Sequence, residues 1–272
     1  MTSFYTSLNG LKNAETDLGV IAHNIANAET AGFKKSSTQF ADIVANGSAS
    51  NPRLSQGIGA TVASITQDFS LGSIEQTGRS LDLAIDGDGF FTTRNPENNE
   101  FFYTRNGGLG IDGAGNIRDF ADQRLQVFPT DAAGTVTSTA ATVDAVVPLT
   151  NGAGSDLSNI TVEKNGVIFA SYADGTSTAI GRLAVANFVA PEGLRAIGQT
   201  KWEATGISGA AIFDLPGIGK AGQILSGAIE RSNVDLAEEM VALIVAQRNF
   251  QANAKAIDTA TQMSQTVINL RS

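Results

Sequence analysis

The 272-residue chain contains no cysteine and only one histidine, His23. Without cysteine it can form neither disulfides nor thiolate metal sites, and it has no thiol nucleophile. A histidine acts as a catalytic base only beside a nucleophile or an orienting carboxylate, and a zinc site needs several ligands. His23 falls in a predicted helix beside Asn24, so we interpret it as a surface or interface residue. The composition predicts no metal site and no enzyme activity.

Basic residues are also scarce, because 18 Lys and Arg stand against 27 Asp and Glu, a formal net charge of −9. Nucleic-acid binding depends on clustered Lys and Arg that neutralise phosphates, so the charge argues against a nucleic-acid partner. No apolar run approaches the roughly 18 residues of a membrane-spanning helix, which predicts no insertion into a membrane. The first residues also lack the basic segment and apolar core of a cleaved signal peptide. Taken alone, these features predict a cytoplasmic protein, unless export needs no cleaved signal.

Two glycine-containing segments look like ligand-binding motifs but lack the required context. Residues 217–222 match G-x-G-x-x-G, but Pro216 precedes them and strand-like residues 223–227 follow. A dinucleotide site requires a strand before the motif and a helix that begins inside it. Residues 86–89 resemble the start of a calcium loop, but phenylalanine occupies positions 5 and 6, where an oxygen ligand and glycine are needed. We therefore predict a turn in each place and no bound cofactor.

What the sequence does contain is a helical apolar pattern at each end. Apolar residues recur every three or four positions in residues 3–28 and again from about 233 to 271. At 1.5 Å per residue, these segments predict helices of about 40 Å and about 55 Å. Gly32 is expected just after the end of the first helix, and Asn233 is expected to cap the second.

Such apolar stripes have to be buried, so we expect them to pack against each other or against copies of the same chain. Ala14 and Ala28 continue the first stripe. The predicted assembly interface consists of Phe4, Leu8, Leu11, Leu18, Ile21, Asn24, Ile25 and Asn27 in the first helix and of Leu236, Met240, Leu243, Gln247, Phe250, Ile257, Met263, Val267 and Leu270 in the second.

The residues between the helices have the short-period pattern of β-structure. Apolar and polar residues alternate over 81–86, which predicts a half-buried strand. Asn106-Gly107 and Asp174-Gly175 predict hairpin turns. Residues 129–158 have few large apolar side chains and are predicted to form a loose excursion or a small β flap. Residues 40–44 are expected to form a short helix.

The predicted fold class is α+β, with long N- and C-terminal helices that form a paired helical stem and a mainly antiparallel β domain between them. Residues 1–30 and 233–272 are assigned to a coiled-coil-like assembly domain. Residues 31–70 are assigned to a linker region and residues 71–232 to the β-rich domain. The chain enters the β-rich domain from the first helix and leaves it into the second, so the domain has to bring residues near 30 and near 232 close together.

Several segments resemble a known protein family. Residues 18–35 read LGVIAHNIANAETAGFKK, and residues 232–241 and 246–255 read SNVDLAEEMV and AQRNFQANAK. These segments are similar to the terminal signatures of the bacterial flagellar rod and hook axial proteins. Residues 77–91 and 103–107 resemble the β domain that the same family shares.

The resemblance implies a structural subunit of the bacterial flagellar hook. Such a subunit polymerises into a helical tube that transmits torque and contains the export channel. Residues 233–236 and 245–249 favour the hook protein, but residues 129–158 are too short for the outer domains of typical hook proteins. A flagellar basal-body rod protein is therefore the close alternative. A third class, a secreted oligomeric binding module, would form small closed oligomers instead of tubes.

The implied partners are copies of the same chain, other flagellar axial proteins (of the rod, the hook–filament junction and the hook cap) and the flagellar type III export apparatus. This route exports its cargo without a cleaved signal peptide, which would place the protein in the flagellum. We expect the terminal helices to become fully ordered only when neighbouring subunits cover them. Polar residues of the helices are expected either to set the helix register or to line the channel: Asn24, Asn27, Gln247, Asn249 and Asn253.

Overall fold

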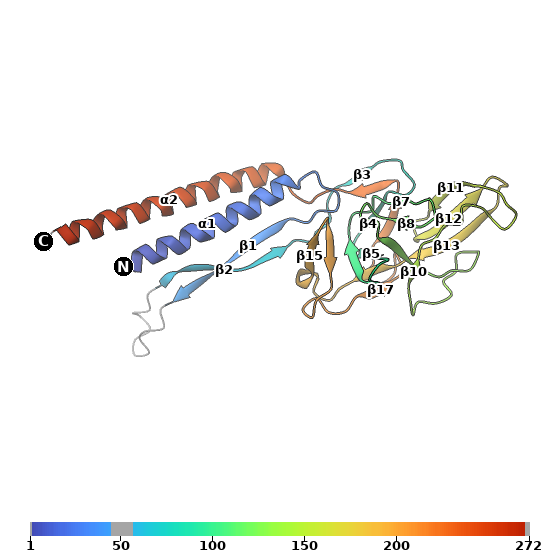
Figure 1. Ribbon diagram of the computed structural model, residues 1–272, viewed down its shortest axis with the longest axis horizontal. Coiled ribbons are helices and arrows are strands. Elements are labelled where there is room, and N and C mark those ends of the chain that lie inside the picture. Colours follow the sequence, from blue (N-terminus) through green and yellow to red (C-terminus); the bar gives the residue numbers. More distant parts are fainter. Residues whose placement is uncertain (1, 45–56, 270–272) are drawn as a thin grey trace. The chain divides into compact units, whose positions relative to one another are not determined.

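The computed structural model describes residues 2–44 and 57–269 of the chain. These residues belong to two compact units (Figure 1). The first unit lies within residues 1–28, 35–68 and 234–272, and the second comprises residues 29–34 and 69–233. Two helices thus flank a mostly antiparallel β domain along the chain, in agreement with the predicted fold class.

The first unit contains both helices and one β-hairpin. Helices α1 (Thr2–Ala26) and α2 (Leu236–Asn269) lie side by side, and the hairpin of strands β1 (Ser36–Val44) and β2 (Gly57–Gln67) runs along α1 (Figure 1). The helix expected over residues 40–44 was wrong, because this segment lies in β1. Its exposure alternates with a period of two against β2, which a helix would not produce.

The start of α2 differs from the expected one by two residues. The Oδ1 atom of Asp235 accepts hydrogen bonds from the backbone N–H groups of Ala237 (2.8 Å) and Glu238 (3.2 Å), so Asp235 is the N-cap. Asn233 does not cap the helix, because its side-chain amide donates to the backbone and side-chain oxygens of Ser70. An aspartate at this position also suits the positive end of the helix dipole.

The second unit is built on a 13-stranded sheet with the central order β11-β12-β13-β9-β5-β6-β16-β15. Strand pairs β18–β4 and β19–β3 lie outside this sheet, and every ladder between named strands is antiparallel. The strands are β3 (Ile74–Gln76), β4 (Leu83–Asp86), β5 (Phe90–Arg94), β6 (Phe101–Thr104), β7 (Gly110–Ile111), β8 (Ile117–Arg118), β9 (Arg124–Phe128), β10 (Val143–Asp144), β11 (Leu157–Val162), β12 (Val167–Tyr172), β13 (Ser177–Leu183), β14 (Val185–Asn187), β15 (Arg195–Gly198), β16 (Lys201–Glu203), β17 (Ile212–Asp214), β18 (Gln223–Ser226) and β19 (Ala228–Glu230).

Two hydrophobic clusters fill this unit. The larger one contains apolar residues from the strands that include Leu83, Phe91 and Leu125, all with no exposed surface. The smaller one is aromatic and is centred on Phe90 and Trp202. Burial of this kind contributes about 25 cal/mol for each Å² of apolar surface removed from water, which makes the clusters the main source of stability.

Four turns of the second unit share one design. Side-chain Oδ1 atoms of Asp112, Asp119, Asp131 and Asn151 each accept hydrogen bonds from the backbone N–H groups two and four residues further on. The residue three positions on has a positive φ angle, and it is glycine in three turns and Asp122 in the fourth. These side chains satisfy the turn's own backbone donors, which is why Asp and Asn are favoured there.

The sequence-based turn predictions had mixed outcomes. The hairpin at Asp174-Gly175 is confirmed, because β12 pairs with β13 and Gly175 has a φ angle of 84°. The hairpin at Asn106-Gly107 was wrong, because the flanking strands β6 and β7 do not pair with each other. Glycine is needed at 107 for a different reason, since a Cβ there would collide with the carbonyl oxygen of Leu83.

The two remaining segments are turns and short bridges. Residues 129–158 contain β10 and several isolated bridges, and Ala145 and Val147 anchor this excursion in the larger core cluster. Residues 217–222 connect β17 with β18 and are followed by a strand, so they lack the helix that a dinucleotide site requires.

Candidate assembly surfaces

The residues of α1 that lie against α2 recur along the sequence at alternating intervals of three and four positions. A Cβ on Gly10 would lie 2.5 Å from Oδ1 of Asn253, and the amide of Asn24 donates to Oε2 of Glu239 (3.2 Å). The two contacts place low numbers of α1 against high numbers of α2, so the helices run antiparallel. Residues at this spacing are buried or half-buried in both helices: Ser7, Gly10, Ala14, Asp17, Ile21 and Asn24 in α1, and Glu239, Leu243, Ala246, Phe250, Asn253 and Ile257 in α2.

The predicted apolar stripe of α1 divides between this contact face and a neighbouring flank. Ile21 and Asn24 belong to the contact face and are 6% and 1% exposed. With a rotation of about 100° per residue, the other apolar members lie on a flank about a quarter turn away. Phe4 on this flank is exposed, and its other members are half-buried: Leu8, Leu11, Leu18 and Ile25.

The second helix carries more exposed apolar surface than the sequence analysis predicted. Leu243, Phe250 and Ile257 lie on the face toward α1, whereas Leu236 and Met240 remain exposed. Three further exposed apolar residues in the same turns are absent from the predicted interface: Val241, Ile244 and Val245. Gln247 and Met263 are exposed as well, and the side chain of Val267 and all of Leu270 lie outside the described residues.

A buried polar cluster joins both helices to the hairpin inside the first unit. Asn24 donates to the carbonyl oxygen of Ser36 (2.8 Å), accepts from the Ser36 N–H (3.0 Å) and bonds to Glu239. Lys35 forms ion pairs with Glu239 (2.9 Å) and Glu238 (3.1 Å). Burial opposes the charge of Lys35, but these two carboxylates raise its pKa. The cluster ties three elements to one register, because each member needs the others as partners.

Asn27 has a more local role in the structure. Its side-chain amide donates to the carbonyl oxygen of His23 (2.9 Å), so it satisfies a backbone acceptor in the last turn of α1. His23 itself is exposed.

The second unit contains a buried ionic cluster that the sequence analysis did not identify. The carboxylate of Glu230 has no exposed surface and accepts from Lys34 Nζ (2.5 Å), the Gly72 N–H (3.0 Å) and Arg105 Nη1 (3.3 Å). Lys34 also donates to the carbonyl oxygen of Ser70 (2.6 Å). The cluster thus fastens three segments that enter or leave this unit, near residues 34, 70 and 230.

The described residues offer no sign of a metal or a membrane-spanning element. Within residues 2–44 and 57–269, no group of three or more metal-binding side chains is placed to hold an ion. Among the helices that the structure describes, none is long and apolar enough to cross a membrane. The features that stand out are instead exposed apolar side chains along α2. Exposed apolar surface of this kind is typical of proteins that act through contacts with other chains.

Comparison with known proteins identifies the family. Residues 4–34 match the family described as "Flagella basal body rod protein". Residues 84–170 match "Flagellar hook protein FlgE/F/G D1 domain", and residues 225–270 match "Flagellar basal body rod FlgEFG protein C-terminal".

Two relatives represent the two branches of this family. The chain is 33% identical to the flagellar basal-body rod protein FlgG of Bacillus subtilis (strain 168) over 282 positions, which cover 100% of this chain and 99% of the relative. It is 26% identical to the flagellar hook protein FlgE of Salmonella typhimurium over 410 positions, which cover 99% and 100%. A solved structure of Helicobacter pylori flagellar hook protein FlgE2 matches with 14% identity and a TM-score of 0.22, over 71% of this chain and 39% of that one.

The chain belongs to the family of flagellar rod and hook proteins. Within the flagellum it is an axial structural protein, as its relatives are.

Proposed function

We propose that this protein polymerises into a helical tube of the flagellar axis, which transmits torque and surrounds the export channel. The observation that carries the proposal is the apolar surface of α2. Leu236, Met240, Val241, Ile244 and Val245 are between 43% and 62% exposed in the single chain. A helix with apolar residues on all sides is stable in water only when other surfaces cover it. Copies of the same chain supply such surfaces, and contacts that do not close into a ring produce a helical filament.

The paired helices act in this proposal as a coiled-coil-like stem of the assembly domain. The small residues Gly10 and Ala14 in α1 allow a close approach to α2, and the cluster around Asn24 holds the register. The outer surfaces of both helices then remain available for neighbouring subunits. The predicted interface residues on those surfaces, Phe4, Leu236 and Met240 among them, keep their proposed role in assembly.

Between the two branches of the family, we propose the rod as the place of this subunit. The alignment with the rod protein is 282 positions long, only slightly longer than the 272-residue chain, so the two proteins match without a large insertion. The alignment with the hook protein is 410 positions long, against 272 residues here, so the hook relative carries long inserted segments. A hook subunit, which the motifs at residues 233–236 and 245–249 favour, is the second candidate.

Partners and export follow from the same proposal. Neighbouring axial proteins of the rod, the hook–filament junction and the hook cap would contact the ends of the tube. The flagellar type III export apparatus would deliver the subunit without a cleaved signal peptide. Microscopy of gold-labelled subunits relative to the outer-membrane ring separates rod from hook, because the rod lies inside that ring and the hook outside it.

Polymerisation itself is tested by placing charge on α2. In the double variant Val241→Glu/Val245→Glu, two exposed side chains become carboxylates, so the single chain should fold as before. We expect tubes to disappear from electron micrographs and from sedimentation. The control Gln251→Glu/Thr259→Glu adds the same charge at exposed polar positions of the same helix and should still polymerise. Tubes formed equally well by both variants would show that this surface is not the interface.

A further inference from the structure

The second unit is connected to the rest of the chain at four places. The chain crosses from one unit to the other after residues 28, 34, 68 and 233. We call the three stretches of the second unit next to these crossings its boundary segments: residues 29–34, 69–73 and 230–233. Any pull that the helices exert on the second unit reaches it through these segments, so the contacts that hold them in place decide how the unit resists the pull.

Two of the boundary segments leave a short β-ladder at the same end. In the antiparallel pair of β3 and β19, Glu230 lies opposite Ile74 at the end where both boundary segments begin. The next backbone bond outward runs from the Arg231 N–H to the carbonyl oxygen of Ser73 (2.8 Å). The bonds of an antiparallel ladder are perpendicular to its strands, so two strands pulled apart at one end lose their bonds one at a time. The strongest contact near that end therefore sets the resistance to the pull.

The buried pair of Lys34 and Glu230 supplies this contact and joins all three boundary segments. Oε1 of Glu230 accepts from Lys34 Nζ (2.5 Å) and from the Gly72 N–H (3.0 Å). Lys34 Nζ also donates to the carbonyl oxygen of Ser70 (2.6 Å), and the Gly32 N–H donates to the carbonyl oxygen of Glu230 (2.8 Å). Hydrogen bonds to charged groups are about twice as strong as neutral ones. Both side chains have no exposed surface, so water cannot replace these bonds while they are intact.

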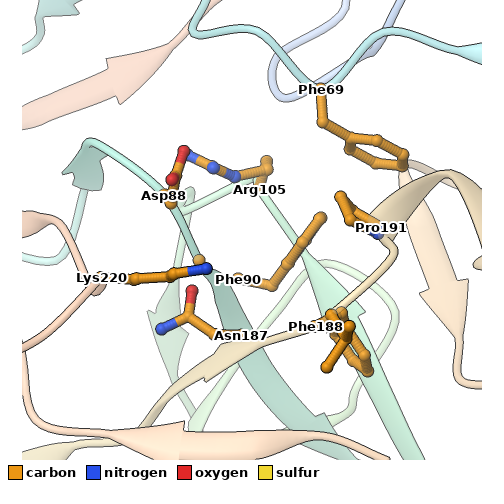
Figure 2. Close-up of a pocket in the computed structure, with 10 residues that line it drawn as sticks. Phe69, Asp88, Phe90, Arg105, Asn187, Phe188, Pro191 and Lys220 are labelled. Atoms are coloured by element: carbon orange, nitrogen blue, oxygen red, sulfur yellow. The ribbon is translucent and has the colours of Figure 1, made fainter. Parts of the chain in front are cut away.

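Arg105 fastens the same carboxylate to the interior of the unit. It directly follows β6, which pairs with β5 and β16 in the large sheet. Its Nη1 donates to Oε2 of Glu230 (3.3 Å) and to the carbonyl oxygen of Gly87 (2.9 Å). The guanidinium carbon lies 5.2 Å from the centroid of the Phe90 ring, at the wall of a surface hollow (Figure 2). Glu230 is thus held by the boundary segments on one side and by the sheet on the other.

We propose that Lys34 and Glu230 form a mechanical clamp, which sets the force at which the second unit opens when it is pulled through its boundary segments. This role differs from a contribution to stability alone. Core residues such as Leu125 stabilise the unit without lying between the segments that receive the pull. The inference rests on the proposed function, because a tube that transmits torque loads each subunit through these segments. The clamp keeps the β domain folded while its helices are under load.

The test pulls the full chain in optical tweezers from two different pairs of attachment points. The chain has no cysteine, so introduced cysteines give unique attachments. Glu29→Cys/Ala237→Cys loads the boundary segments, whereas Glu97→Cys/Gly152→Cys loads the same unit through two exposed turns. With the first pair, Glu230→Gln should shorten the lifetime of the folded unit at constant force about tenfold or more, because a buried partner is lost where the force acts. With the second pair, the change should stay below about threefold, because the force bypasses the clamp.

Three further variants separate the clamp from general stability. Lys34→Met removes the other partner and should show the same dependence on the attachment points, which keeps the test open if Glu230→Gln does not fold. Leu125→Ala creates a cavity in the core and should shorten the lifetime equally for both pairs of attachment points. Glu203→Gln removes an exposed carboxylate and should change neither lifetime more than about twofold.

The outcomes for the clamp and for the proposed function can be told apart. If the clamp variants shorten the lifetime by the same factor for both pairs of attachment points, the clamp is refuted, and the proposed function stands as long as the wild-type chain forms tubes. If the wild-type chain forms no tubes, the proposed function is refuted. A lifetime that depends on the attachment points would in that case still support the clamp, because pulling is measured on single chains.

Discussion

Removal of the charge on Glu230 is the most informative perturbation of the β domain. The Glu230→Gln variant keeps the shape of the side chain but leaves Lys34 and Arg105 in a buried site without a carboxylate. Lys34 and Glu230 have no exposed side-chain surface, and the Lys34–Glu230 pair is 2.5 Å long. Loss of one partner from a buried pair costs about 3–5 kcal/mol of unfolding free energy, because the remaining charge stays desolvated. For a unit of this size, each kcal/mol lowers the Tm by about 2–4 °C.

The assay is chemical denaturation followed by the fluorescence of Trp202, which reports on the same unit. A matched control is Glu203→Gln, which removes a carboxylate from the exposed pair with Arg195 and should cost less than about 1 kcal/mol. The double variant Glu230→Gln/Lys34→Met should recover part of the loss, since it also removes one uncompensated cation. If Glu230→Gln and Glu203→Gln lose the same stability, the ionic cluster does not hold the segments together as argued.

Three further predictions concern turns and helix ends. Gly154→Ala should lower the unfolding free energy by about 1 kcal/mol, because Gly154 has a positive φ angle. Gly115→Ala should lower it further, because the new Cβ would also meet the backbone oxygen of Val147. Urea unfolding measures both values. Asp235→Ala should lower the unfolding free energy by about 1 kcal/mol, because it removes the N-cap of α2. The helicity measured by circular dichroism should therefore be higher for Asn233→Ala than for Asp235→Ala. Hydrogen bonds from Thr176 lower the pKa of Asp174 to about 2, so its contribution to stability should persist at neutral pH and be lost as the pH falls from about 4 through 2. An NMR titration midpoint near 4 for this carboxyl would refute the last prediction.

The helices could be predicted from the sequence because their apolar residues repeat over many turns. The short segment at residues 40–44 could not, because four apolar residues in five positions fit a helix and a strand equally well. Its partner β2 lies beyond residues 45–56, so the ladder that decides between them involves residues distant in the sequence.

The assembly surfaces were predicted only in part, for a related reason. The contact face of α1 contains Gly10 and Asp17, which an apolar pattern does not select. The apolar pattern therefore predicts one stripe of larger side chains, although some of them face α2 and others lie on the outer flank. The ionic cluster around Glu230 could not be predicted from the sequence, because its partner Lys34 is 196 positions away along the chain.

The turn that begins at Asn151 has a practical consequence for locating the protein in the cell. Its backbone donors are satisfied by its own side chain, and a Cβ on Gly152 or Gly154 would have no heavy atom within 4 Å. Exposed turn tips of this kind accept inserted peptides with little effect on folding. An epitope inserted after Gly152 would therefore leave the sequences of both helices unchanged, and an antibody could bind it on the β domain.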